Sequence, residues 1–274
     1  MRYKAVISYF GAPYAGWQRQ LNALSVQEVL ENALTKVFGA PTSCTASGRT
    51  DAGVHAEGQV IHFDADTSIP EDKIPFAVNA ELPDDISMLL CEAVGDDFNA
   101  RFAAKRKTYC YKLYLARHRR PILESTRLQV PVPLDITLMR DAGHIIEGTH
   151  DFKCFQAAGS AIKNTVRTIY QVRISTGSLP IIPMPTPDPA LADVPMLLNL
   201  TDPREFNCTV DISVTGNGFL YNMVRIIAGT LVYIGMGKLP IECLEEAFES
   251  RDRTALGKTL PAKGLHLVEV KYEE

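Results

Sequence analysis

The sequence predicts an α+β protein built from two similar halves. Stretches in which apolar and polar residues alternate are typical of half-buried strands, and stretches in which apolar residues recur every three or four positions are typical of helices. Both the first third of the chain and the rest of it give the order strand, helix, strand, strand, helix, strand. That order is typical of a ferredoxin-like unit with an antiparallel sheet. We therefore expect two β-α-β-β-α-β halves, over 1–104 and 105–274.

The first half contains the clearer signals. Ser25 and Glu28 form a capping box at the start of an apolar helical pattern, and Gly39 ends that pattern. Pro70 is favourable in the first turn of a second helix. The expected elements are, in order, a strand over 3–10, a helix over 26–38, strands over 42–49 and 59–66, a helix over 70–80 and a strand over 86–94.

The second half repeats this order with one interruption. Asp135 can cap a helix that Gly148 ends, and seven prolines lie within 177–204, which predicts an extended surface insertion. The other expected elements are strands over 107–116, 165–175, 206–215 and 265–272, and helices over 220–234 and 241–250.

Composition and cysteine content exclude several classes of protein. The chain has 274 residues, 46% hydrophobic and 22% charged, which is ordinary for a globular protein. No apolar run approaches the ~20 residues of a membrane span, and no signal peptide is recognisable at the start. The six cysteines are scattered without a Cys-x-x-Cys pair. We therefore expect a cytoplasmic protein with free thiols, no membrane association and no zinc site.

A basic cluster stands out against a net charge of −4. The segment 101–123 holds eight Lys and Arg residues and no acidic residue. Such a cluster can bind a polyanion while the acidic remainder keeps the protein soluble, although a solvated basic loop would look the same. Ferredoxin-like sheets, as in RNA-recognition modules, present a broad face to nucleic acid. The candidate RNA-binding residues are Arg101, Lys105, Arg106 and Lys107.

The stretch 46–63 combines chemistry with a sharply turning backbone. Gly48, Gly53 and Gly58 fall within eleven residues, which indicates tight bends or a close approach by another segment. Arg49 and Asp51 are two positions apart, so on a strand they would share a face. An arginine can hold a nucleophilic aspartate ionised, or bind a phosphate. Without further information, an Asp that caps a turn beside a surface Arg is strongly favoured as the explanation of the pair.

Other candidate residues remain open on the sequence alone. Tyr109 follows the basic cluster in a strand, where a core tyrosine is the simpler interpretation. Arg225 lies in a mostly apolar helix, so it must pair with a carboxylate such as Asp51 or extend to solvent. His55 and His62 are the nearest approach to a metal-binding pair, but no Cys or carboxylate cluster completes it.

The string Gly-Arg-Thr-Asp-Ala-Gly-Val-His over 48–55, followed by Gly58-Gln59-Val60, closely resembles the signature of the tRNA pseudouridine synthase A family. Weaker resemblances follow in the same order along nearly the whole chain. They are the strings at 16–20, 25–27, 78–83, 98–102, 109–111, 150–152, 166–169, 222–225 and 264–265.

The resemblance implies a function for these residues. The fold would be that of pseudouridine synthases, and the enzyme would isomerise uridine in the anticodon stem-loop of tRNA, at positions 38, 39 and 40. It would work as a homodimer without metal or cofactor. Asp51 would attack the target uridine, and Arg49 would position Asp51 and contact RNA. Tyr109 would stack on the uracil, Leu265 would close the pocket, and Arg225 would be the basic partner of Asp51.

Two features depart from the family pattern. Asn99 stands where the family more often has His, and the proline-rich insertion is longer than expected. Two other functions stay open. A non-catalytic RNA-binding protein would use the basic cluster but leave the Asp51 string idle. A nucleoside or glycoside hydrolase would need a second carboxylate, for which Glu57 and Asp64 are the candidates.

Overall fold

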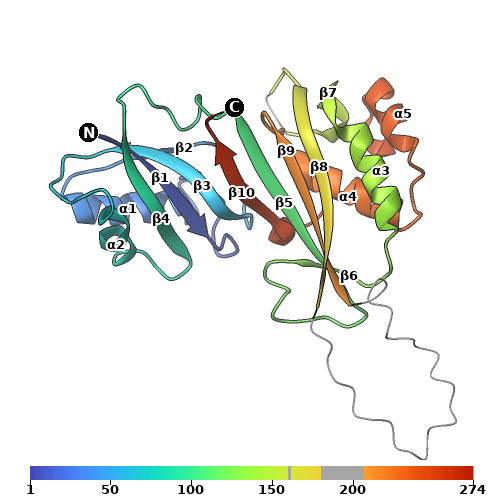
Figure 1. Cartoon of the computed structure of the whole chain (residues 1–274), viewed down its shortest axis with the longest axis horizontal. Helices are drawn as coiled ribbons and strands as arrows, with labels where there is room; N and C mark the ends of the chain where they lie inside the picture. The colour runs from blue at the N-terminus through green and yellow to red at the C-terminus, as the bar shows by residue number, and fades with distance from the viewer. Residues whose placement is uncertain (160–161, 180–206, 274) are drawn as a thin grey trace, which may run out of the picture.

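The computed structural model describes residues 1–159, 162–179 and 207–273, and most of the proline-rich insertion therefore lies outside the described residues. Its elements form a mixed α+β protein with one large sheet (Figure 1). In chain order they are β1 (Arg2–Tyr9), α1 (Val26–Phe38), β2 (Cys44–Ala46), β3 (His55–Asp64), α2 (Ile74–Asn79), β4 (Ile86–Val94), β5 (Arg106–Leu115), β6 (Leu128–Val130), α3 (Ile136–Ile146), β7 (Gly148–Asp151), β8 (Val166–Ser178), β9 (Cys208–Gly216), α4 (Met223–Gly235), α5 (Cys243–Ser250) and β10 (Leu265–Lys271).

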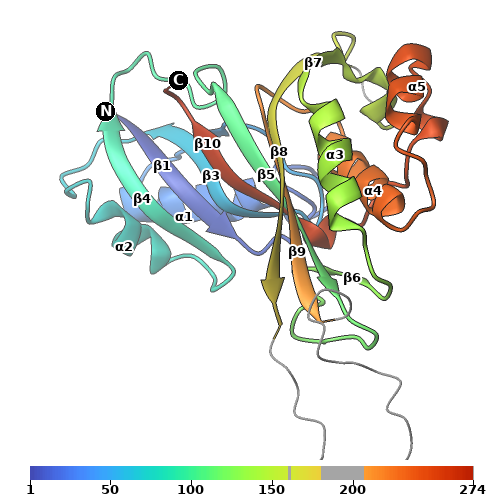
Figure 2. The same cartoon turned by 45° about the vertical axis from the view of Figure 1, so that its right-hand side comes forward.

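Within the described residues the sheet has ten strands, in the order β4-β1-β3-β10-β5-β9-β8-β7, with β2 beside β3 and β6 beside β5. Neighbours along this path pair antiparallel except β10 and β3, which pair parallel. The parallel contact is short and joins His266 to His55 and Leu267 to Ala56. Figure 2 shows β10 lying between β3 and β5. The last strand of the chain therefore connects the first half of the sheet to the second.

Two apolar cores lie against this sheet. One combines β1, β3 and β4 with α1 and α2, and the other combines β5, β8 and β9 with α3, α4 and α5. Leu267 of β10 belongs to the first core and Leu265 to the second. Because residues two apart on a strand share a face, the helices of both halves cover the same face of the sheet.

The capping signals at Ser25, Asp135 and Gly39 are confirmed, whereas α2 begins after Pro70 and α3 ends before Gly148. The Ser25 side chain accepts a hydrogen bond from the N–H of Glu28, and Asp135 accepts one from Leu138. Gly39 ends α1 with a φ of 70°, a left-handed conformation that suits glycine. All six cysteines are free and buried, as expected. No helix in the described part of the chain is long and apolar enough to span a membrane.

Several predicted boundaries are wrong for local reasons. The helix expected from residue 220 begins at Met223, because Asn222 adopts a φ of 60° that an α-helix excludes. The strand expected over 42–49 ends at Ala46, and residues 47–54 form an irregular loop before β3 begins. The short strand β7 was not predicted.

Candidate active site

The loop over 47–54 is tied to the sheet at its beginning. Ser47 donates its N–H to the carbonyl of Val60 at 2.7 Å and its hydroxyl to Oε1 of Gln59 at 2.7 Å. Gln59, which is fully buried, donates its amide to the carbonyl of Gly48 at 2.9 Å. The Lys107 amine donates to the carbonyl of Ser47 at 2.5 Å. These contacts fix the backbone just before Arg49.

The middle of the same loop is held by the first strand and by the loop after it. Tyr9 and Thr50 share a hydrogen bond between their hydroxyls at 2.7 Å, and the carbonyl of Thr50 accepts the N–H of Trp17 at 3.0 Å. Gly16, with a φ of 91°, allows the close approach, since a Cβ there would lie 2.7 Å from the Thr50 carbonyl oxygen. Asp51 is therefore carried by a backbone fixed on both sides.

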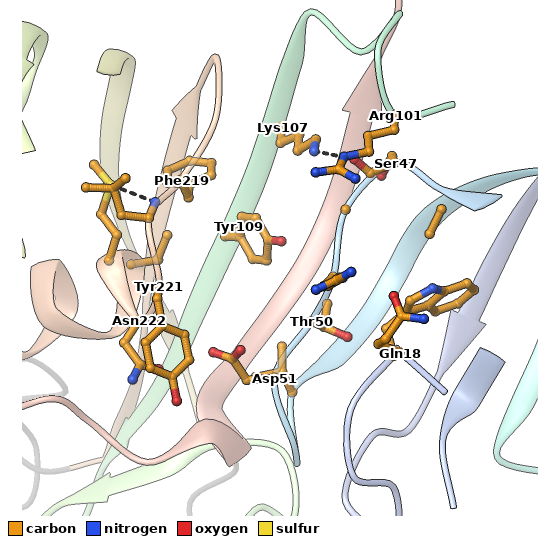
Figure 3. A pocket seen from close by; sticks show the side chains of 18 of the residues that line it. Gln18, Ser47, Thr50, Asp51, Arg101, Lys107, Tyr109, Phe219, Tyr221 and Asn222 are labelled. Carbon is orange, nitrogen blue, oxygen red and sulfur yellow. Dashed lines mark hydrogen bonds between the residues drawn. The ribbon is translucent and has the colours of Figure 1, made fainter. Parts of the chain in front are cut away.

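Asp51 lies in a cleft of about 1090 Å³ between the two halves of the molecule. One wall is the segment 44–51, and the other consists of β5 and the segment 219–224 that leads into α4. Figure 3 shows Asp51 directed across the cleft toward Tyr221 and Asn222, with the ring of Tyr109 nearby. The cleft contains six of the predicted site residues, namely Arg49, Asp51, Arg101, Lys107, Tyr109 and Leu265.

The charge of Asp51 is controlled by burial and by one cation. Burial raises the pKa of the Asp51 carboxyl above its ordinary value, and the positive charge of Arg225 opposes that rise. Arg225 is held by two hydrogen bonds of 2.6 Å, from Nε to the carbonyl of Leu260 and from an Nη atom to Oδ1 of Asn222. Arg225 thus acts on Asp51 through its field, without a direct ion pair among the described residues.

Arg49 takes a different position from the expected one. The argument that Arg49 and Asp51 share a strand face is wrong, because residues 47–54 do not form a strand. Both residues nevertheless line the cleft. The Arg49 side chain is exposed and makes no ion pair or side-chain hydrogen bond with any described residue. Its guanidinium is therefore available to an anion.

Tyr109 forms an apolar wall together with residues from the second half. Its ring meets the ring of Phe219 edge to face, with centroids 5.2 Å apart. Burial raises the pKa of the Tyr109 hydroxyl, and the neighbouring acidic groups of Tyr9 and Asp51 raise it further. The phenol therefore stays protonated at neutral pH. Leu265, which is 6% exposed, contributes the first residue of β10 to the same cleft.

The four predicted RNA-binding residues do not all lie in the cleft. Arg101 and Lys107 line the cleft, whereas Lys105 and Arg106 do not. The Arg106 guanidinium lies 4.6 Å from the ring centroid of Tyr170 on β8. Since alternate residues of β5 face opposite sides of the sheet, Lys107 and Arg106 cannot serve one contact surface.

Phe219 and Tyr221 also line the cleft but were not predicted as site residues. They lie in the irregular segment before α4, where no periodicity marks them. Their closeness to the string that contains Arg225 was the available signal. Tyr221 is 45% exposed, which is high for a large aromatic side chain bordering a carboxylate.

The histidines have structural contacts. His55 accepts the N–H of Gly11 and stacks on His266, with ring centroids 4.7 Å apart. His62 accepts the N–H of Ala100 at 3.1 Å. No group of three metal-ligating side chains occurs within the described residues.

Comparisons with known proteins agree with this geometry. A family model described as tRNA pseudouridine synthase matches residues 5–103 and 143–273. The chain belongs to the tRNA pseudouridine synthase family. It is 42% identical over 269 residues to tRNA pseudouridine synthase A of Ruminiclostridium cellulolyticum, with 98% of each chain covered. It is 41% identical over 276 residues to tRNA pseudouridine synthase A of Bacillus licheniformis, with both chains covered in full.

The matched regions contain most of this cleft. The tRNA pseudouridine synthase model covers the loop over 47–54, the segment 219–224 and β10, and it leaves out 104–142. That gap contains Lys107 and Tyr109. These two residues lie outside the match to the family model but inside the match to the full-length relatives.

Proposed function

We propose that this chain is an isomerase that converts uridine to pseudouridine in tRNA, with Asp51 as its catalytic residue. Family membership supports the reaction and the substrate class. The observation that carries the proposal is a single desolvated carboxylate, Asp51, in a cleft that also presents Tyr109 and an unpaired Arg49. A cleft of about 1090 Å³ has room for a nucleotide turned out of its helix.

The reaction breaks the bond between C1′ of the ribose and N1 of the uracil. The base turns within the cleft, a bond forms between C1′ and C5, the proton on C5 leaves, and N1 takes up a proton. Asp51 acts as the nucleophile and must be ionised, a state that Arg225 favours. Tyr109 stacks on the uracil, and stacking can return ~1–3 kcal/mol of the cost of flipping the base. Leu265 and Phe219 exclude water while the base is detached.

The target uridines are those at positions 38, 39 and 40 of the anticodon stem-loop. Arg49, Arg101, Lys105, Arg106 and Lys107 bind the phosphate backbone, which makes the affinity depend steeply on salt. Lys105 and Arg106, which lie outside the cleft, contact parts of the tRNA beyond the target nucleotide. The enzyme works in the cytoplasm as a homodimer, whose second copy enlarges the positive surface available to a tRNA.

The same proposal extends to the architecture. Each half is a ferredoxin-like unit, divided at residue 104, with the C-terminal strand β10 shared along the join. In support, the strands of the first half follow the order β4-β1-β3-β2, and those of the second follow β10-β5-β9-β8. Two separate apolar cores are also consistent with two units.

The position preference can be tested with tRNA transcripts that keep one uridine at 38, 39 or 40 and carry cytidine at the other two. After incubation with the chain, pseudouridine is mapped by carbodiimide modification and primer extension. The proposal predicts stops at each of the three positions and at no uridine outside the anticodon arm. Tight binding without any stop would instead support a non-catalytic RNA-binding protein.

A further inference from the structure

Lys107 carries a positive charge that the described residues leave unpaired. Its side chain extends from β5 to the cleft, and its amine makes one hydrogen bond, to the carbonyl of Ser47 at 2.5 Å (Figure 3). No described carboxylate lies within ion-pair distance of this amine. A partly buried lysine without a counterion is uncommon, because removing its charge from water is costly.

The charged group that acts on Lys107 is Arg101, which is also positive. Burial, together with the positive charge of Arg101, lowers the pKa of Lys107 to about 8. The Arg101 guanidinium lies over the ring of Phe102, 5.6 Å from its centroid, and it too has no carboxylate partner among the described residues. On the strands beside β5, Lys107 faces Gly216 and Val270, neither of which is charged. A pair of unpaired cations at one wall of a cleft suits a phosphate.

Gly48 keeps space for the Lys107 amine. A Cβ at position 48 would lie 2.9 Å from Nζ of Lys107, and apart from its two chain neighbours no other described residue lies within 4 Å of it. The backbone of Gly48 is not in the left-handed region, so other residues could adopt its conformation. The glycine is therefore explained by the amine that lies against it.

We propose that Lys107 and Arg101 bind a phosphodiester next to the target nucleotide, and that Lys107 is a positioning residue that couples this phosphate to the loop carrying Asp51. The coupling passes through the hydrogen bond from Lys107 to the Ser47 carbonyl. This inference rests on the proposed function. It goes beyond general RNA binding, because it assigns to Lys107 an effect on the chemical step that Arg101 lacks.

The bound phosphate supplies the missing counterion and holds the Lys107 amine in its place. The amine then fixes the Ser47 carbonyl, and Gln59 fixes the Ser47 hydroxyl and the Gly48 carbonyl from the other side. A correctly bound RNA backbone thus strengthens the restraint on the loop at the moment when the uridine enters the cleft. Misplacement of a catalytic group by about 1 Å can cost 100-fold in rate, so this restraint affects catalysis.

The test separates binding from chemistry with four variants, measured by single-turnover rate at saturating tRNA and by Kd. Lys107→Met removes the amine, and Lys107→Arg keeps a charge that can reach both partners. Gly48→Ala pushes the flexible amine away from Ser47 but leaves its charge in the cleft. Arg101→Ala removes only a phosphate contact. Lys112→Met, on the opposite face of β5, is the matched control.

We expect Gly48→Ala to lower the single-turnover rate by about 10-fold or more, the range for losing a hydrogen bond from a charged group, with Kd within about twofold of wild type. Lys107→Met should lower both rate and affinity, Lys107→Arg should restore most of each, and Arg101→Ala should raise Kd alone. Wild-type rates for both Gly48→Ala and Lys107→Met at saturation would overturn the inference. An inactive wild-type chain would instead overturn the proposed function. If Lys107→Met has a much lower Tm than the wild type, the result for Gly48→Ala decides the outcome.

Discussion

Two lysines on one strand show how the faces of the sheet differ. Lys112 of β5 points to the face without helices, where its amine lies 2.5 Å from Oε1 of Glu57, and Glu57 also meets Nδ1 of His266 at 3.1 Å. Lys107, five residues earlier, points to the cleft and has no carboxylate partner among the described residues. Lys112 has a carboxylate counterion within the protein, whereas Lys107 gains a counterion only when a phosphate binds.

Two carboxylates from the same stretch of sequence repeat this contrast. His266 and Lys112 hold the pKa of Glu57 down to about 2, so its charge is balanced within the protein. Burial raises the pKa of Asp51, and only the field of Arg225 opposes it. Groups whose charge is balanced stabilise the fold, and groups left poorly balanced mark the site where chemistry is done.

The largest effect that tests this contrast is the loss of Asp51. Asp51→Asn should lower the rate of pseudouridine formation by at least about 1,000-fold, because an amide cannot act as the nucleophile. The affinity for tRNA should be kept or improved, since a negative charge leaves the cleft. Pseudouridine is measured by mass spectrometry of digested tRNA, with Glu57→Gln as the control. Equal losses in both variants would contradict the assignment of catalysis to the cleft face.

Removing Arg225 should have the next largest effect, seen as a shift in the pH profile. Burial raises the pKa of Asp51 and Arg225 lowers it, so Arg225→Met moves that pKa further up. Because the reaction needs the ionised carboxylate, the acid limb of the rate profile moves to higher pH. Single-turnover rates measured from the usual carboxyl pKa of ~4 up to neutral pH follow this limb. An unshifted limb would show that Arg225 does not act on Asp51 in this way.

A smaller effect is expected on the salt dependence of tRNA binding. Each phosphate contact to a single strand contributes about 0.7 to the slope of log Kd against log salt concentration. Arg49→Ala and Arg101→Ala should each reduce the slope by about this amount. Lys112→Met should leave it unchanged, because that charge is already paired with Glu57. A reduced slope for Lys112→Met would mean that RNA takes the Lys112 amine out of its ion pair with Glu57.

The smallest effect is on stability. The raised pKa of Asp51 in the folded state means that its ionised form is disfavoured by folding. Asp51→Asn should therefore stabilise the protein at neutral pH, and the gain should disappear below the unfolded pKa of ~3.9, where the carboxyl is protonated in both states. A gain of about 1 kcal/mol would raise Tm by about 2–4 °C in differential scanning calorimetry. A lower Tm at neutral pH would show that Asp51 has a structural role.

Much of the fold could be predicted because its signals are local. Ser25 and Asp135 start their helices through their own side chains, and Gly39 ends α1 through its own φ. The start of α4 was predicted three residues too early, because the apolar pattern does not mark the φ of 60° at Asn222, whose Oδ1 accepts a hydrogen bond from Arg225. The strand order depends on pairings between distant segments, such as His266 with His55.

The candidate site also has residues that the sequence predicted and residues that it did not. Arg49 and Asp51 are marked by an unusual string, and both lie in the cleft. Phe219 and Tyr221 were missed because they lie in an irregular segment, where no periodic pattern of apolar residues marks them. The difference between Lys107 and Lys112 could not be predicted, since it depends on which side of the sheet Glu57 and Ser47 occupy.

The most direct test of the central claim uses tRNA whose uridines carry tritium at C5. The purified chain and its Asp51→Ala variant are each incubated with it, without added metal or nucleotide. Isomerisation expels the tritium to water, because C5 becomes the atom bonded to the ribose, whereas hydrolysis would leave the tritium on free uracil. The account predicts release by the wild type and none by the variant. Release by Asp51→Ala, or tritiated uracil in place of tritiated water, would contradict it.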